Sequence, residues 1–223
     1  MKENSSRIIV DNYLKTRRKA IDVSEWYDIL WALRGLGAKP RDFIVELGAG
    51  EGFLLDFLKM KGYKNVVGID IRGDGKKVIR MDLERNYPPQ ADYYIFQHFI
   101  EHINQKRAIG LLKYCYSKGK AIIGILPGHF VNDESHIINH YEYEDVLSLV
   151  AKISPKFYVI RPDIASFANP AVRDWLLILS KKRISARQTF SFAGKVLLFG
   201  FKTYLKLLLR IKEKGLEGFL CAQ

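Results

Sequence analysis

Apolar residues in this chain form short continuous runs separated by stretches in which they recur with helical spacing. The runs predict strands at residues 43–47, 66–69, 92–96, 121–126, 157–160 and 175–179. Residues 53–61, between the first two runs, have the spacing of a helix. Strands that alternate with helices predict an α/β fold, in which helices cover both faces of a doubly wound, mainly parallel sheet.

The pattern changes at both ends of the chain. Residues 1–40 are predicted to form an N-terminal helical flank, with Ser24 as the N-cap of an apolar stretch that includes Trp26 and Leu33. The main domain is predicted to span 41–182, and 183–223 to form a basic C-terminal extension.

Within this extension, Lys195, Lys202, Lys206 and Arg210 are separated by seven, four and four residues, which places them on one stripe of a helix. The rest of that helix is strongly apolar, so the pattern predicts an amphipathic helix. One interpretation is that 184–223 lies on an anionic membrane surface, with lysines at the headgroups. The other is that it packs on its own domain or mediates self-association.

Composition is that of an ordinary globular protein, with 223 residues, 48% hydrophobic and 27% charged. Two cysteines, Cys115 and Cys221, are too few for a disulfide scaffold, and the N-terminus has no apolar signal-peptide core. These features favour a cytoplasmic protein. The net charge is +12, of which residues 181–223 contribute +8, with ten basic and two acidic residues. Nucleic acid is disfavoured as a partner, because the basic excess is not on the main domain.

The strongest chemical signal is a glycine-rich loop, Glu46-Leu47-Gly48-Ala49-Gly50-Glu51-Gly52, directly after a predicted strand and before a helix. Such glycines let the backbone turn sharply and approach a ligand beside the helix N-terminus. The dinucleotide fingerprint needs glycine where Phe53 stands, and the Gly-Lys-Ser/Thr ending of a phosphate loop is absent. Asp70 ends the next predicted strand, where its carboxylate can accept hydrogen bonds from both ribose hydroxyls.

This order of motifs resembles the S-adenosylmethionine-binding half of the class I methyltransferases, over roughly residues 40–180. Met81-Asp82-Leu83 is similar to the segment that this family places near the adenine, and residues 91–103, 123–127 and 133–141 resemble its later motifs. The resemblance implies a Rossmann-like sheet, S-adenosylmethionine as cofactor and methyl transfer as the reaction. The cofactor-binding residues that it indicates are Glu46, Gly48, Ala49, Gly50, Gly52, Asp70, Ile71, Asp82, Leu83, Gln97, His98 and His102.

All five histidines lie between residues 98 and 140. Three of them, His98, His129 and His136, are candidate catalytic residues, because imidazole can act as general base toward an oxygen acceptor. His102 either contacts the cofactor or has a structural role. The sequence His98-Phe99-Ile100-Glu101-His102 also fits the H-x-x-E-H pattern of zinc proteases. Because it follows a strand of a nucleoside-binding domain and not a metalloprotease helix, we expect no metal.

The acceptor is predicted by exclusion. Amino-methylation of nucleic-acid bases normally uses an Asn/Asp-Pro-Pro-aromatic stretch, whereas residues 97–100 read Gln-His-Phe-Ile. Carbon methylation of pyrimidines needs a nucleophilic cysteine, and Cys115 is predicted within a helix. The sequence therefore favours a small-molecule or lipophilic methyl acceptor. The alternatives are a zinc-dependent hydrolase using His98, Glu101 and His102, and a catalytically silent S-adenosylmethionine-binding adaptor.

Overall fold

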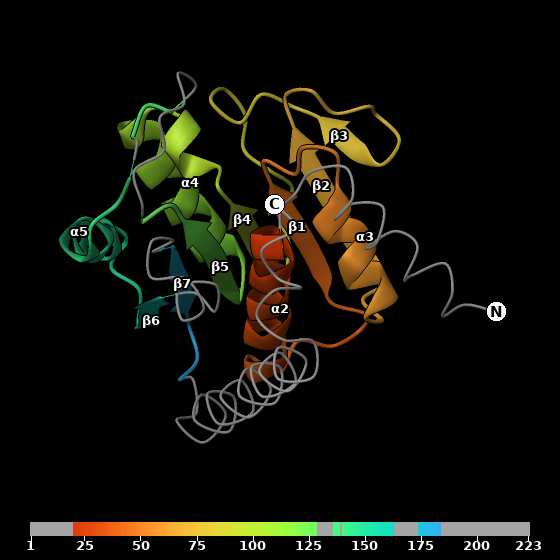
Figure 1. Cartoon of the computed structure of the whole chain (residues 1–223), viewed down its shortest axis with the longest axis horizontal. Helices are drawn as coiled ribbons and strands as arrows, with labels where there is room; N and C mark the ends of the chain where they lie inside the picture. Colours follow the sequence, from red (N-terminus) through yellow and green to blue (C-terminus); the bar gives the residue numbers. More distant parts are fainter. Residues whose placement is uncertain (1–19, 129–135, 139, 163–173, 184–223) are drawn as a thin grey trace, which may run out of the picture. The chain divides into compact units, whose positions relative to one another are not determined.

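The computed structural model describes residues 20–128, 136–138, 140–162 and 174–183, with side chains from residue 25 onward (Figure 1). These residues belong to a compact unit, Met1–Ile184. The second unit, Ser185–Gln223, and with it the predicted amphipathic helix, lies outside the described residues.

The described part of the chain contains a sheet of seven strands in the order β3-β2-β1-β4-β5-β7-β6. Five neighbouring strands, β3, β2, β1, β4 and β5, are parallel, whereas β7 runs antiparallel to both β5 and β6. The predicted doubly wound, mainly parallel α/β fold is therefore confirmed. The strands are β1 (Phe43–Leu47), β2 (Asn65–Asp70), β3 (Val78–Arg80), β4 (Tyr93–Gln97), β5 (Ala121–Leu126), β6 (Phe157–Pro162) and β7 (Trp175–Ser180).

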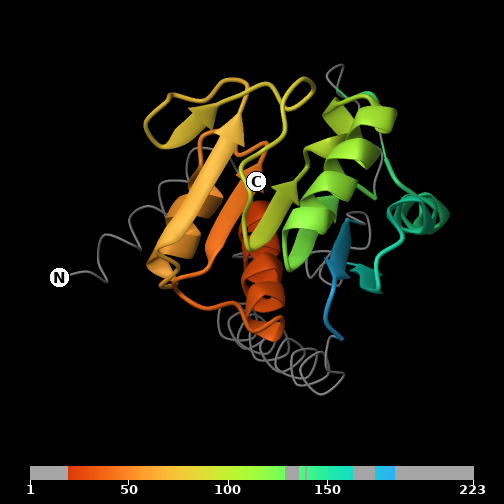
Figure 2. The ribbon, with the colours of Figure 1, turned by 180° about the vertical axis from the view of Figure 1, so that it is seen from behind.

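Helices cover both faces of the sheet (Figures 1 and 2). Helices α2 (Ala20–Gly35) and α3 (Phe53–Met60) pack on one face, and α4 (Gln105–Lys118) and α5 (Tyr143–Ile153) on the other. A short 3₁₀ helix, η1 (Ile100–His102), precedes α4. Alternate strand residues point to opposite faces, so Ile44 and Ile95 lie in the first core and Val45 and Phe96 in the second. Burial on both faces explains why these strands read as continuous apolar runs.

The structure differs from the sequence prediction at two elements. Strand β3 lies where only a loop was expected between Asp70 and Met81; Val78 is its only buried residue, so it has no apolar run. Helix α2 begins at Ala20, so Ser24 is inside the helix and is not its N-cap. The four residues before Ser24 include no proline or glycine that would stop the helix.

The sheet has a topological switch point between β1 and β4. From β1 the chain proceeds to β2 on one side, whereas β4 and β5 lie on the other side. Loops that leave adjacent strands in opposite directions open a crevice at the carboxyl ends, where ligands bind in sheets of this kind. Leu47 and Phe96 are paired neighbours near these ends. Residues 48–52 and 97–102 therefore flank the expected ligand crevice.

Across the described segments, every helix is too short or too polar to cross a membrane.

Candidate functional site

The glycine-rich loop after β1 turns sharply, as the sequence predicts. Gly48, Gly50 and Gly52 have φ angles of 71°, 52° and 73°, in the left-handed region that favours glycine. A Cβ atom on Gly48 would also lie 2.4 Å from the Phe99 ring. Gly52 is the N-cap of α3, so the loop leads directly into the positive end of a helix. Ala49 donates its N–H to the carbonyl of Ile69 at 3.0 Å, which holds the loop against β2.

Asp70 connects the end of β2 to this loop. Its Oδ2 accepts the Gly50 N–H at 2.9 Å and its Oδ1 accepts the Arg72 N–H at 2.8 Å. The residue is 8% exposed, whereas the neighbouring Ile71 is 60% exposed. Each carboxylate oxygen has a second lone pair, so these bonds leave Asp70 able to accept hydrogen bonds from ribose hydroxyls.

Glu46, on β1, is buried behind the loop. Burial raises the pKa of its carboxyl to about 8, with the positive charge of Lys77 acting in the opposite direction and the negative charge of Asp70 adding to the rise. Among the described residues its Oε2 has no hydrogen-bond partner. Glu46 is therefore mostly protonated at neutral pH, and a protonated carboxyl can donate a hydrogen bond.

The two residues predicted near the adenine follow β3. Asp82 accepts the N–H of Glu84 at 2.9 Å and lies 3.4 Å from the guanidinium of Arg85, so its carboxylate caps its own turn. Leu83 is buried in the core on the α4 side, and its carbonyl accepts a hydrogen bond from Arg107. The structure thus places both residues past the end of β3, with Leu83 in contact with α4.

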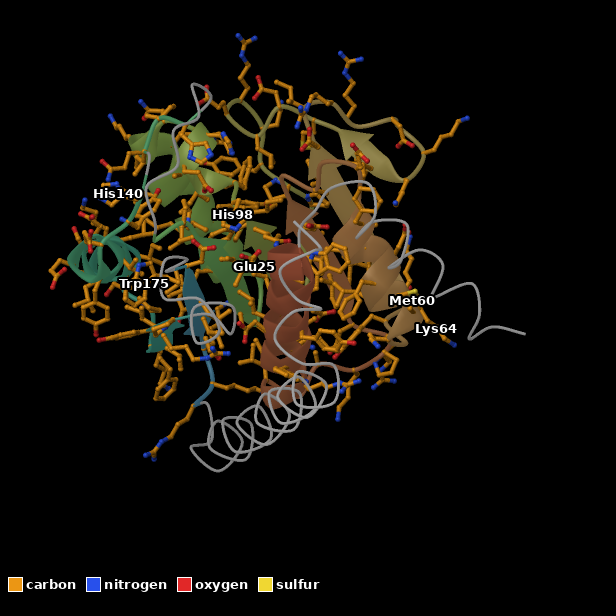
Figure 3. The ribbon with its side chains drawn as sticks, in the orientation of Figure 1. Glu25, Met60, Lys64, His98, His140 and Trp175 are labelled. Atoms are coloured by element: carbon orange, nitrogen blue, oxygen red, sulfur yellow. The ribbon has the colours of Figure 1, made fainter. Side chains whose placement is uncertain are left out.

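Gln97 and His98 are at the carboxyl end of β4, and His98 lies close to Glu25 of α2 (Figure 3). The Gln97 amide donates to Glu25, and the His98 Nε2 lies 3.2 Å from the same carboxylate. His98 has a φ angle of 47°, rare for a residue other than glycine, and such strain concentrates at functional sites. The Nε2 of His98 is also 3.9 Å from Asp174, just before β7.

The charge of His98 is set by these neighbours. Burial by itself would lower its pKa, but the carboxylates of Glu25 and Glu101 raise the pKa well above its ordinary value. The side chain is therefore protonated near neutral pH and acts there as a hydrogen-bond donor. General-base catalysis by His98 stays a prediction. It requires the neutral imidazole, which forms only at higher pH because the pKa is raised.

Glu25 and Asp174 were not identified from the sequence, although both contribute to this site. Glu25 is fully buried, and Asp174 accepts the Gly128 N–H at 3.1 Å. One signal was available for Glu25. It and Asp28 are acidic residues three positions apart in the apolar part of α2, and Asp28 is buried against Arg161 of β6. For Asp174 we find no sequence signal.

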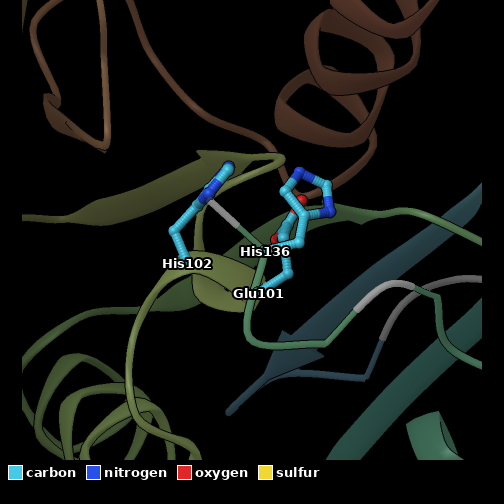
Figure 4. Close-up of side chains that lie close together, drawn as sticks. All are labelled: Glu101, His102 and His136. Atoms are coloured by element: carbon cyan, nitrogen blue, oxygen red, sulfur yellow. The ribbon is translucent and has the colours of Figure 1, made fainter. Parts of the chain in front are cut away.

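The remaining predicted histidines divide into three cases. His102, on η1, and His136, after β5, come together with ring centroids 4.4 Å apart and planes at 89° (Figure 4). His129 lies outside the described residues. His140, which was not chosen as a site residue, is separate from this pair, 3.6 Å from Glu142.

Two groups of side chains place metal-ligating atoms within 4.8 Å of one another in the described part of the chain. They are Glu101, His102 and His136, and Glu25, His98 and Asp174. In the second group the carboxylates already accept hydrogen bonds from Gln97 and Gly128, which satisfies them without an ion.

A cavity of about 590 Å³ lies elsewhere, lined by residues that include Phe43, Asp92 and Lys120. These residues are at or just before the first residues of β1, β4 and β5, so the cavity is at the amino ends of the strands. It is therefore at the opposite edge of the sheet from the glycine loop and from His98.

The sheet order and the loop geometry together define the fold of the class I S-adenosylmethionine-dependent methyltransferases. A similar solved structure is that of an S-adenosylmethionine-dependent methyltransferase from Archaeoglobus fulgidus, with a TM-score of 0.52 and 20% identity over 69% of this chain and 94% of that one. Magnesium protoporphyrin IX methyltransferase from Synechocystis PCC 6803 has a TM-score of 0.55 and 14% identity, covering 75% of this chain and 88% of that one.

A small RNA methyltransferase, HEN1, has a TM-score of 0.52 and 14% identity, covering 71% of this chain and 25% of that one. No family model and no curated protein matches the chain. At these identities the likeness establishes the fold, and the names of the neighbours cover both a porphyrin and an RNA acceptor.

Proposed function

We propose that this protein is an S-adenosylmethionine-dependent methyltransferase. The observation that carries the proposal is the link between Asp70 and the glycine loop, in which the carboxylate at the end of β2 holds the Gly50 N–H at 2.9 Å beside the switch point. This arrangement offers a ribose acceptor, a closely approachable backbone and a helix N-terminus in one place. Gln97 and His98, at the end of β4, lie on the side where the methionine part would extend.

For the acceptor we propose a small or lipophilic molecule. Support comes from the sequence at residues 97–100, which lacks the motif of base amino-methylation, and from the porphyrin acceptor in the name of one fold neighbour. An acceptor panel should nevertheless include RNA, because HEN1 has the same fold. Transfer of labelled methyl groups to RNA, and to no small molecule, would contradict this part of the proposal.

Cofactor binding is tested by calorimetry with S-adenosylmethionine and S-adenosylhomocysteine. The wild type should bind both, and Asp70→Ala should bind them about 5- to 150-fold more weakly, because loss of hydrogen bonds to a charged acceptor costs about 1 to 3 kcal/mol. Asp70→Asn keeps one acceptor oxygen and should fall between the two.

The matched control for Asp70→Ala is Glu144→Ala, which removes an exposed carboxylate in the first turn of α5. It should bind the cofactor as the wild type does. Because Asp70 also holds the glycine loop, the thermal midpoint of each variant is measured alongside. A wild type that binds neither compound would contradict the proposed function.

We further propose that the enzyme is cytoplasmic and that residues 184–223 bring it to an anionic membrane surface, with self-association as the competing role. The basis is the lysine stripe and the +8 charge of residues 181–223. Full-length protein should sediment with anionic vesicles, less so at high salt, and not with neutral vesicles. Replacing Lys195, Lys202, Lys206 and Arg210 by glutamine should abolish sedimentation. A soluble oligomer that ignores vesicles would instead assign the segment to assembly.

A further inference from the structure

Three metal-ligating side chains converge beside the end of β4, outside the glycine loop (Figure 4). Glu101 and His102 are neighbours on η1, and His136 comes from the segment after β5. Their ligand atoms all lie within 4.8 Å of one another. Two imidazoles and one carboxylate from two separate segments form a donor set that proteins use for zinc and related ions.

Backbone hydrogen bonds bring the two segments together. The N–H groups of Ile137 and Ile138 both donate to the carbonyl of Glu101, at 2.8 and 3.2 Å. His136 is therefore next to η1 because of backbone contacts made by the two residues that follow it.

Glu101 is buried, and its carboxylate is incompletely satisfied by the described part of the protein. Its side chain is fully buried, and among the described residues neither carboxylate oxygen accepts a hydrogen bond. The nearest recorded charged group is the Nδ1 of His98, 3.5 Å from Oε1. A buried carboxylate without hydrogen bonds is costly, and coordination of a cation is one of the few ways to compensate for it. Glu25 and Asp174, the carboxylates of the neighbouring group, have backbone or amide donors instead.

From this geometry we infer that Glu101, His102 and His136 bind a divalent transition-metal ion, with zinc or manganese as the ions to test first. This inference departs from the expectation of no metal in the sequence analysis. Donors around a tetrahedral zinc ion are about 3.4 Å apart for bonds of about 2.1 Å, and the three ligand atoms here already lie within 4.8 Å of one another. Three protein ligands leave at least one coordination position open.

The location of the metal site suggests which ligand would occupy the open coordination position. The site adjoins His98 at the carboxyl ends of the strands, where the proposed function places methyl transfer. An oxygen atom of the methyl acceptor is a suitable ligand for an ion bound there. This assignment of an oxygen acceptor rests on the proposed function, whereas the metal site itself does not.

The test is calorimetry of chelator-treated protein with Zn²⁺ and with Mn²⁺ alone, together with the visible spectrum after addition of Co²⁺. The wild type should bind one ion per chain. His136→Ala and His102→Ala should each bind at least ~10-fold more weakly and change the cobalt spectrum. His140→Ala removes a half-exposed histidine four residues from His136 and is the matched control, which should behave as the wild type.

Failure to bind any of these ions would overturn the inference, as would equal binding by His136→Ala and His140→Ala. Glu101→Gln provides a variant of nearly unchanged volume and should also weaken binding. Titrating S-adenosylmethionine into the same samples separates the two proposals. Cofactor binding without metal binding would remove the metal site alone, and metal binding without cofactor binding would remove the proposed function alone.

Discussion

At the residue scale, Glu46 makes the stability of the domain depend on pH. Its pKa is about 8 in the folded protein and 4.5 as the ordinary value. Between these pH values the folded state retains a proton that the unfolded state has lost, so stability falls as pH rises through this window. The contribution of one such proton is about 1.4 kcal/mol per pH unit. Above pH 8 the dependence due to Glu46 ends.

Glu46→Gln should therefore flatten the pH dependence and be more stable than the wild type at pH 8. Chemical denaturation at pH 5, 6.5 and 8 measures the free energy of unfolding for both proteins. Glu144→Gln, at an exposed position, should retain the wild-type slope. If Glu46→Gln and the wild type lose stability equally over this range, the carboxyl of Glu46 is not protonated in the folded protein.

Some residues of the site could be predicted from the sequence, and others could not. The glycines and Asp70 were found because their chemistry depends on residue type and on position relative to one strand. Glu25 and Asp174 were missed because they reach His98 from elements far away in the chain, 73 and 76 positions from it. Pairings of this kind are set by tertiary packing, which periodicity does not encode.

At the scale of elements, a buried ion pair ties α2 to β6. Asp28 is fully buried and accepts a hydrogen bond from the Arg161 guanidinium. Arg161→Ala should destabilise the protein by about 3 to 5 kcal/mol, because it breaks a buried ion pair and removes the guanidinium from the buried Asp28 carboxylate. The free energy of unfolding, measured by urea denaturation, tests this expectation.

The double variant Asp28→Asn with Arg161→Ala removes the buried charge together with its partner. It should recover a large part of the stability lost in Arg161→Ala, and the double-mutant cycle gives the coupling between the two residues. Strictly additive effects would show that Asp28 and Arg161 do not interact. Glu25 is also part of α2. Loss of the ion pair between Asp28 and Arg161 should therefore also disturb the environment of His98.

Elements with strong apolar patterns were predicted well, and elements without them were not. The runs at 43–47 and 121–126 coincide with β1 and β5, because both strands are buried almost throughout. Strand β3 was missed because two of its three residues are exposed, and it exists through its pairing with β2. Because β3 forms through its pairing with β2, its own three residues do not predict a strand.

At the scale of the whole domain, strand order places the candidate residues at one edge of the sheet. The loop after β1, the carboxylate at the end of β2 and the polar residues at the end of β4 all lie at carboxyl ends on the two sides of the switch point. The cavity near Phe43 and Lys120 lies at the amino ends. The fold thus provides two separated locations for a ligand, and we expect the cofactor at the carboxyl ends.

A crystal structure of the protein with S-adenosylhomocysteine would locate the cofactor. We expect the ribose hydroxyls on the carboxylate of Asp70, the backbone of Gly48–Gly52 against the ligand, and the sulfur past the ends of β1 and β4 toward Gln97. Ligand density in the cavity at the amino ends, or none at Asp70 at saturating concentration, would contradict this expectation.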